Sequence, residues 1–308
     1  MLFLALAVAC SLAIAVVFKV AELRDLDRTA LLTVNYLAAA LLAVVLQGVE
    51  PAGPLTSGLV ALGVGQGVLF IAGFWLFSLA IREAGIGLAA GVMRLSVVVP
   101  FLASWAIWSE APTLWQVVGL VIAGVAFFLV AQPSAEPPGK LGPPDPGSSP
   151  GQALKDENTG PAGRPRRIVG LLALLFLTGG AVDINMKVFQ EEFAGSGVPI
   201  STFLLFVFGV AFLVGAIAVG VTGLRTGRWP SAQAWVWGIG LGLVNYGSAE
   251  FLLRALEEIE GTVAFPANSV AIVLGAALLG RVVWKEPLSR ANLAGLGLAA
   301  AALVLLAG

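Results

Sequence analysis

The sequence has no histidine, a single cysteine and few charged residues, and each shortage excludes a class of function. Without histidine there is no Ser-His-Asp triad, no HExxH metalloprotease site and no imidazole ligand for haem or zinc. One cysteine, Cys10, allows neither an internal disulfide nor a cysteine cluster for a metal. No Walker-type phosphate-binding motif occurs, so ATP is not expected to drive this chain directly. We therefore expect no enzyme activity, no cofactor and no metal.

Charged residues make up 11% of the chain, against about a quarter in soluble domains. Hydrophobic residues make up 58%, and the mean hydropathy is +0.96. This composition predicts an integral membrane protein in contact with the lipid bilayer. The net charge of −1 is spread over loops and forms no basic patch, so it argues neither for nor against nucleic acid, and no nucleic-acid partner is expected.

Continuous apolar runs of about 20 residues are long enough to cross a bilayer as helices. A membrane β-barrel would instead show alternating segments of about ten residues. The fold class is therefore all-α, with ten predicted transmembrane helices at residues 2–19, 29–47, 57–81, 85–108, 113–131, 168–188, 199–221, 234–254, 262–283 and 290–307.

The stretch at residues 132–167 differs from the rest, because it holds nine of the seventeen prolines together with Gly, Ser and charged residues. Such a composition buries too little apolar surface to order itself, so a disordered linker is predicted. It divides the chain into two five-helix units, residues 1–131 and 168–308.

The two halves carry similar motifs in the same order. Because each half has an odd number of helices, the second copy enters the membrane from the opposite face, and the repeats are inverted. The matches are Leu62–Gly67 with Trp237–Gly242, Trp108–Pro112 and Gly119 with Trp284–Pro287 and Gly295, and Phe18–Val20 with Met186–Val188.

An acidic residue and a proline after the fourth helix of each half, followed by a Gly-rich fifth helix, give the chain a family resemblance. With Glu110 and Pro112, and Glu286 and Pro287, it resembles the EamA-type transporters of the drug/metabolite transporter superfamily. The resemblance covers the whole chain except the linker. It implies a ten-helix carrier in which helices one to four and six to nine surround a central cavity, with five and ten packed behind.

Lysine and arginine mark the cytoplasmic face of membrane proteins. In the ten-helix arrangement nearly all of them lie on the side of the linker, which is therefore expected to be cytoplasmic in a multi-pass inner-membrane protein. Those residues are Lys19, Arg24, Arg28, Arg82, Lys140, Lys155, Arg164, Arg166, Arg167, Arg225, Arg228, Arg281, Lys285 and Arg290.

Ionisable side chains inside membrane spans are costly and mark functional sites. Arg94 lies ten residues into the fourth helix, where it is either an anchor for a substrate carboxylate or phosphate or part of an internal ion pair. Asp183 and Asn185 in the sixth helix, and Glu250 in the eighth, are further candidates. Either carboxylate is a candidate for coupling a proton to transport, unless it lies close enough to the surface to be hydrated.

Uncharged polar residues at mid-membrane depth favour a polar cavity as a set, although each one alone also fits helix packing. The candidates for substrate binding among them are Asn35, Tyr36, Gln66, Asn245, Tyr246 and Asn268.

Two pairs of residues occupy equivalent positions in the two halves, at or near helix ends, and we expect them to have structural roles. Lys19 and Lys187 are read as headgroup anchors. Glu110 and Glu286, in short loops at opposite faces, are expected to cap or pair with neighbouring helix ends.

The favoured function is a secondary active carrier of small polar metabolites, such as amino acids, working by alternating access. A non-transporting scaffold or receptor, and an intramembrane lipid-modifying enzyme, are the alternatives. The sequence leaves substrate, direction, coupling ion and oligomeric state open.

Overall fold

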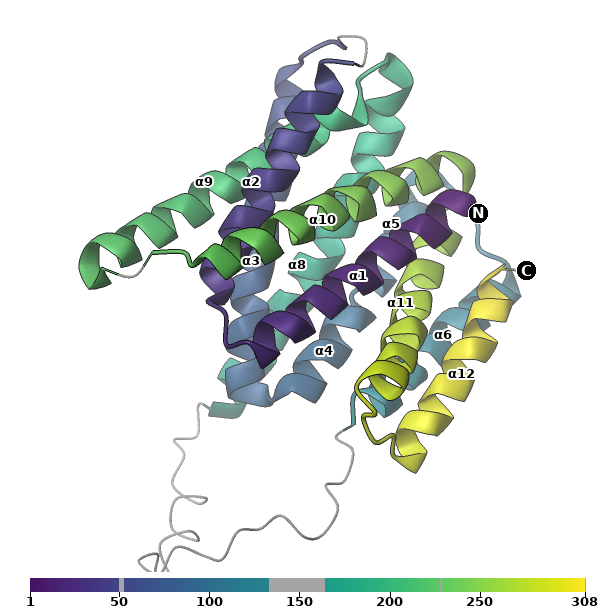
Figure 1. Ribbon diagram of the computed structural model, residues 1–308. Helices are drawn as coiled ribbons and strands as arrows, with labels where there is room; N and C mark the ends of the chain where they lie inside the picture. Colours follow the sequence, from purple (N-terminus) through teal and green to yellow (C-terminus); the bar gives the residue numbers. More distant parts are fainter. Residues whose placement is uncertain (50–52, 133–163, 228, 308) are drawn as a thin grey trace, which may run out of the picture.

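A computed structural model describes residues 1–49, 53–132, 164–227 and 229–307, and the regular structure in these ranges is helical throughout. A helix occupies each of the ten predicted segments, one of them in two pieces (Figure 1). The helices are α1 (Leu2–Leu23), α2 (Arg28–Gln47), α3 (Ser57–Ala84), α4 (Ile86–Leu95), α5 (Val98–Trp108), α6 (Leu114–Val130), α8 (Arg164–Glu192), α9 (Ile200–Thr226), α10 (Ala232–Glu258), α11 (Gly261–Val283) and α12 (Arg290–Ala307), with a short 3-10 helix η1 (Ala194–Ser196).

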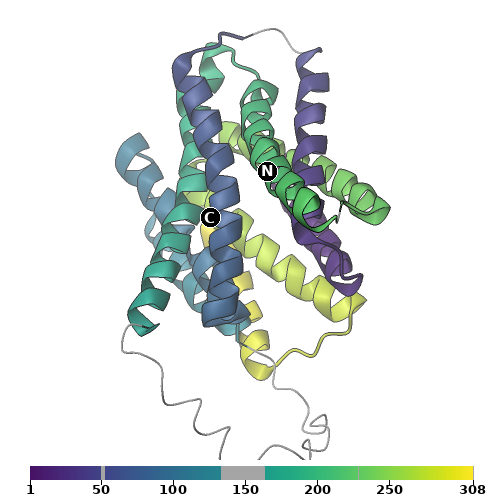
Figure 2. The same cartoon turned by 90° about the vertical axis from the view of Figure 1, so that its left-hand side faces the viewer.

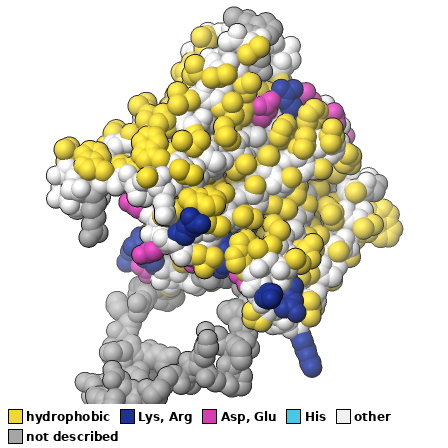
Figure 3. Space-filling view, viewed as in Figure 1, with side chains coloured by type: hydrophobic (Ala, Val, Ile, Leu, Met, Phe, Trp, Pro, Cys, Tyr) yellow, Lys and Arg dark blue, Asp and Glu magenta, His cyan; other side chains and the backbone are white. Residues whose placement is uncertain are grey.

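Within the described ranges, eight helical segments are long and apolar enough to cross a membrane, with α4 and α5 counted together. The other two are α6, which is apolar but has 17 residues, and α10. Hydrophobic side chains cover much of the face in Figure 3, while charged side chains gather near helix ends. The chain is thus a multi-pass helical membrane protein.

Packing partners recur when the two halves are exchanged. The first helix of each half packs on the third of the other, as α1 on α10 and α8 on α3. The second helix of each half packs likewise, as α2 on α10 and α9 on α3. Two further pairs, α2 with α9 and α6 with α12, join a helix to its own counterpart. Figures 1 and 2 show α3 and α8 side by side from two directions.

Glycines of the two GxGxG motifs explain part of this packing, because their missing side chains let helix backbones approach. A Cβ atom on Gly67 would lie 2.6 Å from the Val207 carbonyl oxygen of α9, and one on Gly242 would lie 2.5 Å from the Asn35 carbonyl oxygen of α2. Gly63 and Gly238 have equally close neighbours on the same two helices. These four residues are called the outer glycines below.

The fourth segment differs from the continuous helix that the sequence predicts, since it breaks between α4 and α5 at Ser96 and Val97. Pro100 has no N–H to donate to the Ser96 carbonyl, and its ring crowds that carbonyl. The Ser96 hydroxyl donates to the Met93 carbonyl oxygen at 2.6 Å, which satisfies one acceptor at the break. The break leaves Arg94 in the last turn of α4.

The linker predicted at residues 132–167 lies largely outside the described residues. Its last part, residues 164–167, forms the first turn of α8, so this helix begins four residues before the predicted boundary.

Candidate functional site

A cavity of about 720 Å³ lies between the two halves of the chain. Its walls come from α1, α2, α3 and α4 of the first half and from α8, α10 and α11 of the second, whereas α6 and α12 supply none of its described lining. Glu22 near the end of α1 and Arg28 at the start of α2 are part of the wall. The cavity therefore reaches the end of the molecule at which α1 ends and α2 begins, called the open end below.

Two opposite charges face this cavity, and each half supplies one. Arg94 projects from α4 and Asp183 from α8. The charges influence each other electrostatically, yet neither side chain forms an ion pair within 4.0 Å with a described residue. Both charged groups are therefore available to a ligand that carries a charge of each sign.

Amide side chains form a second polar group on the wall. Asn245 donates through Nδ2 to Oδ1 of Asn35 at 3.2 Å, which joins α10 to α2. The Nδ2 atom of Asn35 and the Oδ1 atom of Asn268 are buried and have no hydrogen-bond partner among the described residues. An unsatisfied buried polar atom costs about 1–3 kcal/mol, so these two atoms favour a polar occupant.

Six of the ten residues predicted for the site line the cavity. They are Arg94, Asp183, Asn35, Tyr36, Asn245 and Asn268. Tyr36 is largely buried, and its ring stacks on Phe208 with centroids 6.4 Å apart.

The other four predicted residues do not line the cavity. Glu250 accepts two hydrogen bonds from the Arg254 guanidinium one turn later in α10, at 2.9 and 2.7 Å. Gln66 is buried and donates to the Val182 carbonyl oxygen at 3.0 Å, which holds α3 against α8.

The remaining two predicted residues, Tyr246 and Asn185, also lie outside the cavity wall. Tyr246 is buried with its ring 6.2 Å from that of Phe208. Asn185, two residues after Asp183 on α8, is outside the described cavity wall.

Several lining residues were not predicted, including Ser11 and Ser78. The sequence did contain a pattern that marks the cavity-facing side of α1. Ser11, Lys19 and Glu22 are spaced by eight and three residues, which places them on one side of the helix. The hydrophobicity of the surrounding run hides that pattern, since most residues on every side of α1 are apolar.

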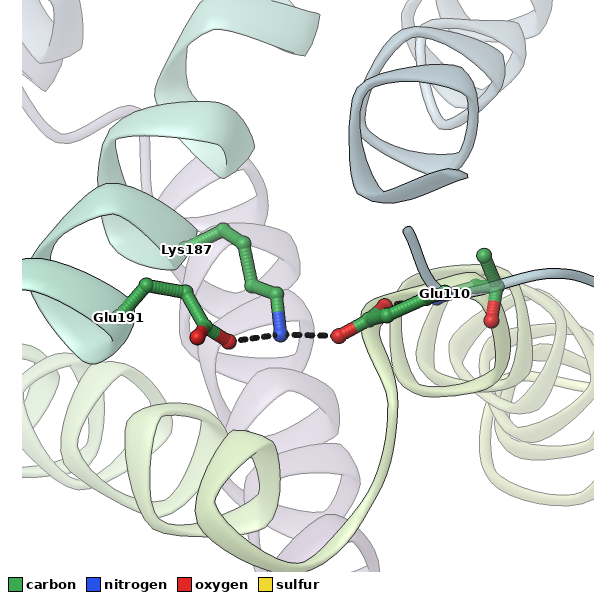
Figure 4. Close-up of polar contacts among 4 residues, drawn as sticks. Glu110, Lys187 and Glu191 are labelled. Atoms are coloured by element: carbon green, nitrogen blue, oxygen red, sulfur yellow. Dashed lines mark hydrogen bonds and ion pairs between the residues drawn. The ribbon is translucent and has the colours of Figure 1, made fainter. Parts of the chain in front are cut away.

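A buried ion-pair cluster lies outside the cavity wall, at the far end of α8. Lys187 places Nζ between two carboxylates, 2.5 Å from Oε1 of Glu110 and 2.6 Å from Oε1 of Glu191 (Figure 4). The other oxygen of Glu110 accepts the backbone N–H of Thr262 at the start of α11, at 3.3 Å. The prediction that Glu110 pairs with neighbouring helix ends is thus confirmed. The reading of Lys187 as a headgroup anchor is wrong, because its side chain is 2% exposed.

A metal site finds no support in the described ranges, where histidine, cysteine and carboxylate side chains form no group of three that could hold an ion.

Comparison with known proteins shows a shared fold. The chain is 24% identical over 298 residues to an uncharacterized protein of Haemophilus influenzae, across 94% of this chain and 92% of that protein. A solved structure described as "Crystal structure of protein" superposes with a TM-score of 0.68 at 12% identity, covering 98% of both chains. No protein-family model matches the sequence. The likeness to the solved structure therefore extends over nearly the entire fold of this membrane protein.

Proposed function

We propose that this chain is a secondary active carrier of small polar metabolites, built from ten membrane helices as two inverted five-helix repeats. The observation that carries this proposal is the cavity between the halves, with Arg94 and Asp183 on its wall and one end open. A membrane protein that binds a polar solute between two related bundles is suited to alternating access.

Helix packing supports the inverted repeat. Exchanging the halves converts the α1–α10 contact into the α8–α3 contact, and the outer glycines of each GxGxG motif face the second helix of the opposite half. Placing α6 and α12 behind the cavity also fits an EamA-type drug/metabolite transporter. The distribution of lysine and arginine supports a cytoplasmic position for the open end and the linker.

The charges indicate the kind of substrate. A guanidinium offers a two-pronged partner for a carboxylate or phosphate, and a carboxylate suits an amine or a proton. An amino acid or related compound carries both complementary groups, and the amide residues Asn35, Asn245 and Asn268 lie on the same cavity wall.

A thermal-shift screen of purified protein in detergent tests the proposal, using amino acids, organic acids, sugar phosphates, nucleosides and cationic drugs. Ligands stabilise the folded state by mass action, so weak binders register at concentrations far above their Kd. Arg94→Ala is expected to lose the response to the active class. Arg82→Ala, an exposed arginine at the end of α3 outside the cavity wall, is the matched control and is expected to keep it.

Compounds that bind are then loaded into proteoliposomes for counterflow measurements. Uptake of a labelled compound that requires the same unlabelled compound inside demonstrates a carrier. Binding without uptake under any ion gradient would instead favour a receptor, and stabilisation of Arg94→Ala equal to wild type would remove Arg94 from the site.

A further inference from the structure

Two lysine–glutamate ion pairs occupy matched positions in the two halves. The Lys187 cluster (Lys187, Glu110 and Glu191) is described above. Lys19 near the end of α1 contacts Oε1 of Glu286 through Nζ at 3.1 Å, and these two residues are called the Lys19 pair. In both cases the lysine comes from the first helix of one half, and the glutamate follows the fourth helix of the other.

The loops that carry the two glutamates share one backbone conformation. Ser109 and Lys285, which precede them, have positive φ angles of 59° and 55°. The N–H of Glu110 donates to the Ser104 carbonyl oxygen at 3.2 Å, and the N–H of Glu286 donates to the Gly280 carbonyl oxygen at 3.1 Å. Each bond joins two residues that are six positions apart, so the two helix ends have the same geometry. The glutamates are therefore held in the same way.

The surroundings of the two pairs are opposite. In the Lys187 cluster the lysine is 2%, Glu110 12% and Glu191 36% exposed, and the ammonium also lies 6.0 Å from the ring centre of Trp108. In the Lys19 pair the exposed fractions are 37% and 48%, and Lys19 lines the cavity. At one end of the molecule the contact between Lys187 and Glu110 is therefore buried, while the matched Lys19 pair at the open end is exposed.

We propose that these ion pairs are the two gates of the carrier and exchange surroundings during each cycle. When the halves rock, α1 and α11 close over the Lys19 pair, and α8 and the Glu110 loop separate so that the Lys187 cluster is hydrated. This inference rests on the proposed alternating-access function. Because one pair is dehydrated as the other is hydrated, the electrostatic cost of opening one end is offset at the other, and both states remain accessible.

One residue breaks the symmetry of the gates. Glu191 adds a second carboxylate to Lys187, one turn later on α8. The position that corresponds to it relative to Lys19 is Leu23, which has no charge. The additional charge favours closure at the Lys187 end, in agreement with the state described here.

Cysteine accessibility tests the gates without a substrate. The reporter is Ser269→Cys on the cavity wall, in a Cys10→Ser background that removes the native thiol. A membrane-impermeant maleimide is applied to one side of proteoliposomes at a time, and a terminal tag reports orientation. The unmodified gates should allow labelling from the open end.

Opposing variants are expected to shift labelling in opposite directions. Lys187→Met and Glu110→Gln should each raise the ratio of labelling from the closed end to labelling from the open end by about tenfold. Lys19→Met should lower this ratio, and combining it with Lys187→Met should return the ratio toward that of the unmodified gates. Glu83→Gln, which removes a partner of Arg167 at 3.9 Å between α3 and α8, is the control and should leave the ratio unchanged.

Loss of folding is separated from gating by Lys187→Arg, which keeps a cation between Glu110 and Glu191 and should retain the original ratio. The gates are refuted if Lys187→Met behaves like Glu83→Gln, or if Lys19→Met and Lys187→Met shift the ratio in the same direction. Uptake of a substrate with no change of labelling in any variant would refute the gates and keep the carrier. Opposite shifts without uptake of any compound would keep the gates and refute the substrate assignment.

Discussion

The ammonium of Lys187 contacts two carboxylates although the side chain is only 2% exposed. Removing its ammonium leaves Glu110 and Glu191 next to each other without a counter-charge. Breaking a buried ion pair from one side costs about 3–5 kcal/mol, whereas an exposed pair contributes about 0–1 kcal/mol.

Lys187→Met is therefore expected to lower the unfolding free energy by about 3 kcal/mol, and Lys19→Met by less than about 1 kcal/mol. Denaturant unfolding of the two variants in the same detergent measures the difference. Equal losses would show that the two lysines have similar surroundings in the folded protein.

The sequence predicted cavity-lining residues correctly where their depth in the membrane was the deciding property. Arg94 and Asp183 stand out because a charge in an apolar run needs a reason, and both line the cavity. Glu250 satisfied the same criterion but pairs with Arg254 on its own helix, and the polar Gln66 donates to the Val182 carbonyl oxygen of α8. Depth follows from position along a helix, whereas the direction of a side chain depends on helix rotation, which is fixed by packing between distant segments.

At the scale of helices, each GxGxG motif has two different sides. The outer glycines face a neighbouring helix, and the middle residues, Gly65 and Gly240, have no atom within 4 Å of an added Cβ. Within one helical turn, the outer glycines are therefore required for close helix packing, whereas a side chain at the middle glycine would change only the helix propensity.

Gly67→Ala and Gly242→Ala are expected to destabilise the protein by about 1–3 kcal/mol, because the new methyl group meets a backbone carbonyl oxygen. Gly65→Ala and Gly240→Ala are matched controls that should stabilise it by up to about 1 kcal/mol through helix propensity. Thermal unfolding of all four variants provides the comparison. Destabilisation by the middle substitutions would contradict the open space beside them.

Helix ends were predicted to within a few residues, because each apolar run is bounded by charged, Gly or Pro residues. Pro100 and Pro266 mark two helices whose regularity a proline can break, but the sequence does not show which of the two helices is interrupted. Pro100 and Pro266 look alike in the sequence, yet the helix around Pro266 is continuous and the one before Pro100 is interrupted. The two prolines differ in the helices that pack around them, and this packing cannot be read from the neighbouring sequence.

For the whole molecule, the motifs repeated on each side of residues 132–167 predicted the duplication, and the odd number of apolar runs in each half predicted that the copies are inverted. The repeated contacts of α1 with α10 and α8 with α3 agree with it. The volume and open end of the cavity could not be predicted, because they depend on the relative positions of the two halves. The same holds for the unequal surroundings of Lys19 and Lys187.

The lengths of α6 and α12 have a consequence for the lipid around the protein. With 17 and 18 residues they span about 26 Å, less than the roughly 30 Å of a typical hydrocarbon core, while α8, α9 and α10 have 27 to 29 residues. Short helices thin the adjacent bilayer, and long ones tilt.

The bilayer beside the α6–α12 pair should therefore be compressed, and acyl-chain length becomes a control on activity. Counterflow in vesicles of phosphatidylcholine with 14- to 22-carbon chains is expected to fall as the bilayer thickens. Constant rates across the series would mean that the membrane adapts to these two helices without resistance.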